Sequence, residues 1–412
     1  MKDCLDSADA ILWLMSPAAI RCRCQSVLAA GQRGELAHFA IAEDRLEDAA
    51  DVVVELTRER FPALDVPMHS RWRHFAAGGP DRWQQMADGL DAVTTAERAR
   101  IRIDLVTISV LLDAGAGAEW RYRDAATGES YARSEGLALA SLGLFASGAL
   151  SARDDQPLRA DATALTGLDD AVMAEAFQIG ADNPLVGFAG RTALLRRLGE
   201  AMRGETGLFG NGNARIGNLY DYFAARAAGG RLPATAIFGA VVRGFSGVWP
   251  RRVELDGFNL GDVGRHPAAQ ADGPTNGLVP FHKLSLWLTY SLLEPLAEAG
   301  LGVTGLDALP GLAEYRNGGL LIDSGVLRPR HDAVLGEDHA PESELVVEWR
   351  ALTIPLLDRL ADLVRGRLGL TLHEMPLVKV LEGGTWSAGR RLAAERRDGA
   401  PPIRIVSDGT IF

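Results

Sequence analysis

The segment 273–292, "GPTNGLVPFHKLSLWLTYSL", opens with polar groups and continues as an apolar helix. Four of its side chains need water or a partner: Thr275, Asn276, His282 and Lys283. An imidazole can transfer a proton near neutral pH, and an ammonium can bind a phosphate. One interpretation is that these residues line a pocket whose wall the helix holds in place. The alternative is that Thr275 or Asn276 caps a turn and Lys283 extends its ammonium to water.

A second set of charges lies in 343–364, "SELVVEWRALTIPLLDRLADLV", whose apolar periodicity predicts a core helix. Large apolar residues surround Glu348, Arg350 and Thr353 in this segment. Because residues two apart on a helix do not face each other, Glu348 and Arg350 must each pair with another group. Protein partners would make a structural ion-pair network, whereas a substrate partner would make a site.

Two shorter motifs add carboxylates. In "GFNLGDVGRHP" (257–267) a single acid, Asp262, stands between glycines that would let a ligand approach closely, unless it caps an Asx-type turn. The motif "AEYRNGGLLIDSGVL" (313–327) would be a substrate loop that leads into a buried acid, Asp323. Its polar residues are Glu314, Tyr315, Arg316 and Asn317. Taken alone, the motif favours a β-turn at "RNGG" between two short strands.

Basic residues gather in "VPMHSRWRHFAAGG" (66–79), where His69, Arg71, Arg73 and His74 surround Trp72. Such a cluster could bind a flat or phosphorylated ligand through its aromatic ring and its cationic side chains. The alternative is a surface turn with solvated arginines that Trp72 anchors.

The glycine-rich stretch "GNGNARIGN" (210–218) lacks the GK[ST] of a phosphate-binding loop. Its backbone N–H groups and Arg215 could hold an anion at a helix start, but a tight helix-entry turn is the favoured interpretation. Since no metal, P-loop or dinucleotide signature occurs in the sequence, we expect neither a metal nor a cofactor.

Helical periodicity dominates the chain. It predicts helices at 34–61, 94–115, 133–147, 168–179, 190–202, 215–228, 234–243, 281–297, 343–369 and 385–397. Short strands are predicted at 119–124, 128–134, 251–257 and 403–407, the first two as a hairpin. The expected fold is mainly α: a single domain over 1–412 with a few short strands and possible lobes at 1–150 and 151–412.

The formal charge of −11 argues against a general binder of nucleic acids or anionic membranes. Three cysteines (Cys4, Cys22 and Cys24) give no disulfide framework, and the last two point to different helix faces. No apolar run reaches the roughly 20 residues of a membrane span, and no basic leader opens the chain. We therefore expect a cytoplasmic protein that acts on a small molecule, as a monomer or homodimer.

Several long motifs resemble the uracil-catabolism protein family of fungi and bacteria. They include "VPMHSRWRHF", "DLVTISVLLDAGAGAEWRYRD", "RSEGLALASLGLF", "GLVPFHKLSLWLTYSLLEPL", "EYRNGGLLID" and "PPIRIVSDGTIF". The resemblance spans nearly the whole chain. It implies a place in the route that degrades uracil through a ribosylurea intermediate to urea.

A more distant resemblance is to the queuosine 5′-phosphate N-glycosidases of queuosine salvage, helical enzymes related in architecture to helix-hairpin-helix glycosylases. On this resemblance Glu348 and Arg350 match a Glu-x-Arg pair, Asp262 matches an earlier acid, and Pro280 matches a helix-entry proline. The glycosidases carry Asp at the position of Asn276, which can hydrogen-bond a ribose hydroxyl but cannot stabilise an oxocarbenium ion. The carboxylate would then come from Asp262, Asp272 or Asp323.

Together the two resemblances imply a metal-independent N-ribosyl hydrolase that releases urea from ribosylurea or its 5′-phosphate. The candidate catalytic residues are Asp262, Asp323, Glu348 and His282. The candidate substrate-binding residues are His69, Arg71, Arg73, Asn276, Lys283, Tyr315, Arg316, Asn317 and Arg350. Two alternatives stay open. One is a hydrolase of the ring or ureido C–N bond of an upstream uridine nucleotide derivative, and the other is a non-catalytic binding or scaffold protein.

Overall fold

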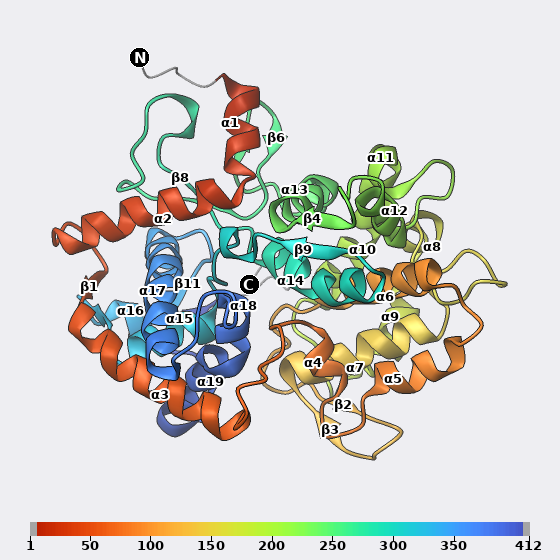
Figure 1. The fold of residues 1–412 in the computed structure, drawn as a ribbon, viewed down its shortest axis with the longest axis horizontal. Helices are drawn as coiled ribbons and strands as arrows, with labels where there is room; N and C mark the ends of the chain where they lie inside the picture. Colours follow the sequence, from red (N-terminus) through yellow and green to blue (C-terminus); the bar gives the residue numbers. More distant parts are fainter. Residues whose placement is uncertain (1–5, 407–412) are drawn as a thin grey trace. The chain divides into compact units, whose positions relative to one another are not determined.

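A computed structural model of the chain describes residues 6–406, and its helices and short strands confirm a mainly α fold (Figure 1). The described chain divides into two compact units. Unit 1 comprises 6–69, 251–286 and 305–406, and unit 2 comprises 70–250 and 287–304. Neither unit ends near residue 150. Among the described residues, no helix has both the length and the apolarity to cross a bilayer.

Unit 1 is built around α17 (Glu344–Leu368), which packs against α2 (Pro17–Gln32) and α3 (Leu46–Arg60) (Figure 1). Ser343 caps the start of α17, and Gly369 ends the helix with φ +70°. The other helices of unit 1 are α1 (Ser7–Leu14), α15 (Tyr315–Asp323), α16 (Ala333–Gly336), α18 (Leu377–Val380) and α19 (Trp386–Arg397), with a π-helix at Leu381–Thr385.

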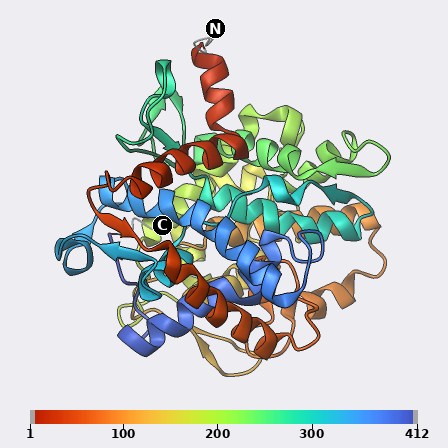
Figure 2. The same cartoon turned by 60° about the vertical axis from the view of Figure 1, so that its left-hand side comes forward.

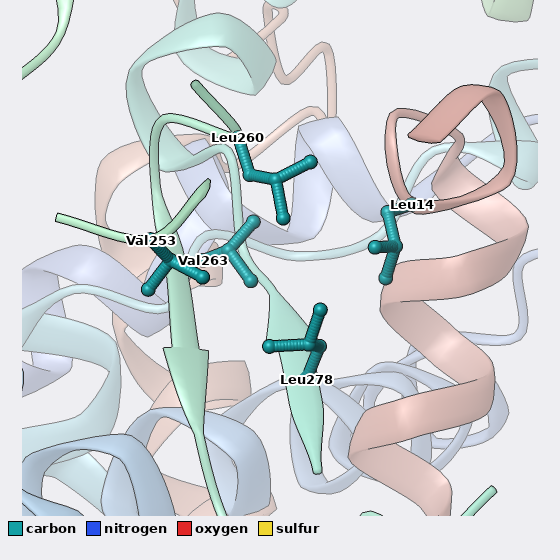
Figure 3. Packing of buried hydrophobic residues seen from close by; sticks show 5 residues of the cluster. All are labelled: Leu14, Val253, Leu260, Val263 and Leu278. Carbon is teal, nitrogen blue, oxygen red and sulfur yellow. The ribbon is translucent and has the colours of Figure 1, made fainter. Parts of the chain in front are cut away.

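Short paired strands complete unit 1. The hairpin β5–β6 (Glu254–Leu255, Phe258–Asn259) lies beside α1 in Figure 2. It leads into β7 (Val263–Arg265), which pairs with β8 (Leu278–Pro280). Figure 3 shows the apolar cluster that fixes these strands against α1, made of Leu14, Val253, Leu260, Val263 and Leu278. The remaining pairs are β1 (Phe39–Ile41) with β10 (Leu327–Pro329), and β11 (Asp338–His339) with β12 (Arg404–Ile405).

Unit 2 packs α6 (Thr95–Leu111) against α7 (Arg133–Ala146). Thr94 caps α6 by accepting a hydrogen bond from the Glu97 N–H, as predicted. The predicted hairpin is present as β2 (Tyr122–Arg123) and β3 (Ser130–Tyr131). The other elements are α4 (Trp72–Phe75), α5 (Arg82–Ala87), α8 (Ala162–Thr166), α9 (Asp170–Ala176), α10 (Phe188–Gly204), α11 (Thr206–Phe209), α12 (Leu219–Ala224), α13 (Ala234–Gly244), β4 (Arg231–Pro233) and β9 (Gly302–Thr304). Helix α14 (Lys283–Glu298) starts in a segment of unit 1 and continues in unit 2.

One helix prediction was wrong at its start. The predicted helix over 34–61 begins only at Leu46, because the preceding residues form strand β1 and pair with β10. The backbone N–H groups of His38 and Phe39 also donate to the Glu348 carboxylate, at 3.1 and 2.8 Å. These tertiary contacts outweigh the helical periodicity of the segment.

The interpretation of 313–327 as a β-turn between two short strands was wrong, because residues 315–323 form helix α15. The helix also replaces the loop of the other interpretation, whose role in substrate binding stays a prediction. Glu314 caps the helix by accepting hydrogen bonds from the N–H groups of Arg316 and Asn317. The glycine at 318 is required by packing rather than by a turn. A Cβ on Gly318 would lie only 2.6 Å from a Trp349 ring atom.

Candidate functional site

The candidate site lies in unit 1 around a buried ion pair between Asp262 and Arg350. The two guanidinium Nη atoms of Arg350 donate to Oδ1 and Oδ2 of Asp262 at 2.7 and 2.8 Å. The β7–β8 pairing places Asp262 here, since its carbonyl accepts hydrogen bonds from the N–H groups of Phe281 and His282. The Arg350 guanidinium also lies 4.0 Å from the centre of the Phe281 ring.

The first residues of α14 complete one side of the site. The Lys283 backbone N–H donates to Oδ2 of Asp262 at 2.9 Å, so the carboxylate lies at the helix N-terminus. His282 adopts a positive φ of 46°, and its ring Nε2 donates to the Leu14 carbonyl at 3.0 Å. Burial lowers the pKa of His282, although the charge of Asp262 raises it. The Nε2 proton of His282 is therefore committed to the Leu14 carbonyl.

Arg350 also contacts the segment that carries a second buried carboxylate, Glu314. Its Nε donates at 3.3 Å to the carbonyl of Ala313, the residue before Glu314. The charge of Lys283 also acts on Glu314. Beside this carboxylate, the Asn317 amide donates to the Leu312 carbonyl at 3.2 Å.

The two carboxylates have pKa values displaced in opposite directions. Burial raises the pKa of Glu314 and outweighs the hydrogen bonds from the Arg316 and Asn317 N–H groups and the charge of Lys283. Burial also acts to raise the pKa of Asp262, but the charge and hydrogen bonds of Arg350 bring it below the ordinary value. Asp262 and Glu314 keep exposed fractions of 8% and 7%, so solvent reaches the edge of the cluster. This arrangement can supply one ionised and one protonated carboxyl group at the same pH.

Glu348 has a different role from its neighbour on α17. Its Oε1 accepts the N–H groups of His38 and Phe39, and its Oε2 lies 3.2 Å from Nε2 of His266. The side chain is fully buried, and it holds β1 and the end of β7 against α17. Glu348 and Arg350 thus have separate partners, as their spacing predicted.

Other candidate residues of unit 1 lie outside the cluster. Asp323 pairs with Arg397 at 2.6 Å, which joins α15 to α19. The Arg316 guanidinium lies 5.2 Å from the centre of the Tyr315 ring and donates to the Gly399 carbonyl.

Asn276 is exposed, and its amide oxygen accepts the Ala271 N–H within the 270–277 loop. The Thr275 hydroxyl accepts a hydrogen bond from Arg23 at 2.7 Å. The Asn276 contact fits the interpretation in which this residue stabilises a turn, whereas Thr275 binds an arginine of helix α2. The Lys283 side chain is buried, so the interpretation in which its ammonium extends into water was wrong.

The basic motif 66–79 divides between the units. In unit 1, Nδ1 of His69 lies 2.8 Å from Glu382, a residue of the π-helix. In unit 2, Arg71 is fully buried and pairs with Asp113 at 3.0 Å, while Arg73 pairs with Glu294. The interpretation of Arg71 as a solvated surface arginine was therefore wrong. Sequence reasoning missed the carboxylates that bind these basic groups, because each lies far away in the chain.

The glycine-rich stretch 210–218 binds a carboxylate of the protein itself. Arg215 donates to Asp104 at 2.6 Å and to Glu97 at 2.6 Å, and the Gly217 N–H donates to Asp104 at 2.6 Å. The helix-entry turn favoured from the sequence is therefore the arrangement observed. The partner, Asp104, was missed because it lies inside the apolar helix α6.

Comparison with known proteins identifies the family of the chain. The family model described as "Protein of unknown function (DUF1688)" matches residues 13–412. Protein urg3 of Schizosaccharomyces pombe is 36% identical over 98% of this chain and 100% of its own length. Uracil catabolism protein 4 of Lachancea kluyveri is 35% identical over 92% of this chain and 93% of its own length. The chain therefore belongs to the DUF1688 family. Its similarity to these two relatives confirms the resemblance to the uracil-catabolism protein family.

Proposed function

We propose that the chain acts in uracil catabolism and hydrolyses the N-ribosidic bond of ribosylurea, or of its 5′-phosphate, to urea and the free sugar. The names of its relatives support the pathway. The observation that carries the reaction is the presence of two buried carboxylates, Asp262 and Glu314, at the starts of α14 and α15, with pKa values shifted in opposite directions. Arg350 binds the first carboxylate and the backbone carbonyl that precedes the second. Cleavage of a glycosidic bond commonly needs one ionised and one protonated carboxyl group.

In this mechanism Asp262 stays ionised and stabilises the positive charge that develops at the anomeric carbon. Glu314 donates its proton to the urea nitrogen as the C1–N bond breaks, because urea is a poor leaving group as an anion. Water adds its oxygen to C1, and the proton that it loses restores the acid. Lys283 supplies a cation for a 5′-phosphate, and Arg350 positions Asp262.

Two other candidate acids suit this step less well. His282 already donates its Nε2 proton to the Leu14 carbonyl, and burial lowers its pKa. Glu348 is fully buried and binds the N–H groups of His38 and Phe39 and the His266 ring, so its carboxylate holds β1 in place instead.

The test is product analysis with purified protein and ribosylurea, with and without a 5′-phosphate, each in EDTA and in added Zn²⁺. We expect urea and free sugar in equal amounts from one of the two compounds. Absence of urea from both, with turnover of an upstream uridine nucleotide derivative, would move the reaction to the ring or ureido C–N bond. Ligand binding without turnover of any of these compounds would contradict the enzymatic proposal and favour a binding protein.

A further inference from the structure

Three metal-ligating side chains meet in unit 1, at the junction of β1 and α17. They are His38, Glu344 and Glu348, and one ligand atom from each lies within 4.8 Å of the others. Glu344 and Glu348 are four residues apart on α17, so they lie on one face of the helix. His38 immediately precedes β1.

In the tautomer that carries its proton on Nδ1, the His38 ring is oriented as a metal ligand would be. Its Nδ1 lies 3.0 Å from Nε2 of His331, and its Nε2 lies 3.9 Å from Oε1 of Glu344. When Nδ1 donates to His331, the Nε2 lone pair faces the carboxylates. A neutral lone pair and two carboxylates repel one another unless a cation lies between them. Metal-ligating histidines commonly have this arrangement, with the second ring N–H bound to an acceptor.

Glu348 is held in place for such a role. Two backbone N–H groups fix its Oε1, and His266 contacts its Oε2. Nδ1 of His266 accepts the Ala268 N–H, so its Nε2 is the donor to Glu348. Because Oε1 already accepts two N–H groups and Oε2 only one, Oε2 has the further lone pair available for a metal.

The site is reachable from solvent. The Glu344 side chain is 48% exposed, and that of His38 is 20% exposed. His331, the partner of His38, also lines a surface depression of about 360 Å³. Because Glu344 is exposed, its side chain can move the short distance needed for metal–ligand bonds of about 2.0–2.2 Å.

We propose that His38, Glu344 and Glu348 bind a divalent transition metal such as Zn²⁺, with water in the remaining position. One imidazole and two carboxylates suit Zn²⁺ better than Mg²⁺ or Ca²⁺, which prefer oxygen ligands alone. The site is distinct from Asp262 and Glu314, so it does not depend on the proposed reaction. Its role would be to join β1 to the start of α17.

The test is calorimetric titration of Zn²⁺ into the full, untagged chain after treatment with a chelator. We expect one site, and at least a tenfold loss of affinity in His38→Ala and in Glu344→Gln. The matched control is Glu342→Gln, which removes the same charge from an exposed residue two positions away and should bind as the native protein does. Glu348 is left intact because it also supports β1.

A spectroscopic measurement identifies the ligands independently of affinity. Co²⁺ in place of Zn²⁺ should give visible absorption bands in the native protein and in Glu342→Gln, and these bands should be lost in His38→Ala. Binding of Zn²⁺ should also raise the melting temperature of the same two proteins. Absence of Zn²⁺ binding by the native chain, or unchanged binding in both ligand variants, would overturn the proposal.

Discussion

Each unit contains a buried Asp–Arg pair that also accepts a backbone N–H, and the two pairs differ in what surrounds them. In unit 2, Asp104 is fully buried, and its partner Arg215 also donates to Glu97. The backbone N–H of Gly217, in the glycine-rich stretch 210–218, donates to Asp104 as well. Burial raises the pKa of Asp104 to about 6, although Arg215 and the Gly217 N–H lower it.

In unit 1, Asp262 keeps an exposed fraction of 8% and accepts the backbone N–H of Lys283, whose charge also acts on the second carboxylate, Glu314. The bidentate contact with Arg350 brings the pKa of Asp262 below its ordinary value despite burial. The comparison suggests that a buried ion pair is structural when its partners enclose it. It becomes a candidate site when a second acid has a pKa shifted in the opposite direction and solvent reaches the pair.

The largest expected effect is on catalysis. Asp262→Asn should lower kcat for urea release by about 10²–10³-fold, because it removes the negative charge that stabilises the transition state. Asn keeps an acceptor for Arg350, so the far-UV circular dichroism should be unchanged. Loss of less than about tenfold in a folded variant would contradict the role of Asp262.

The corresponding change in unit 2 should affect stability instead. Asp104→Ala leaves Arg215 and the Gly217 N–H without their acceptor, and should lower the free energy of unfolding by about 3 kcal/mol. Equilibrium urea denaturation measures this loss. If kcat per folded molecule also fell by more than about tenfold, the assignment of this pair as structural would be wrong.

The third expected effect is on the pH dependence of the rate, to which Asp262 and Glu314 contribute in opposite directions. The rate should fall as pH rises through the pKa of Glu314, which lies above its ordinary 4.5, because the acid must be protonated. It should also fall as pH drops through the pKa of Asp262, which lies below 3.8, because that group must be ionised. Glu314→Gln should lower kcat by about 10²-fold and remove the alkaline limb of the pH–rate profile. An alkaline limb that persists in this variant would exclude Glu314 as the acid.

The smallest effect belongs to a third Asp–Arg pair, which serves as the matched control. Asp358 contacts Arg21 through both carboxylate oxygens, at 3.0 and 3.2 Å, but its side chain is 34% exposed. Asp358→Asn should therefore change the free energy of unfolding by about 1 kcal/mol or less and leave kcat within about twofold. A catalytic loss comparable to that of Asp262→Asn would mean that Asp–Arg pairs of unit 1 act generally through stability.

Local signals predicted most of the fold. The apolar periodicity places α6 and α17 close to their observed bounds. Prediction failed where distant contacts decide the local structure. In the 313–327 motif, "NGG" is typical of a turn, and only packing against Trp349 explains the helical glycine.

The site was predicted in part. The sequence requires partners for Glu348 and Arg350, but the Asp262 partner lies 88 positions from Arg350, and no local rule identifies it. The role of Asp104 was not predicted, because the residues around it in the apolar helix α6 do not indicate its distant partner, Arg215. The cysteines also agree with their helical spacing, since Cys22 is exposed and Cys24 is buried, while Cys4 lies outside the described residues.

The most direct test of the proposed reaction is hydrolysis of ribosylurea, or its 5′-phosphate, in H₂¹⁸O, with immediate borohydride reduction of the sugar. Cleavage of the N-ribosidic bond predicts one ¹⁸O atom on the sugar at C1 and none in urea. The label should be absent from both products when Asp262→Asn is used for the same time. Label in the carbonyl-derived product, or a sugar without label, would show that water attacks a different bond and would contradict the account.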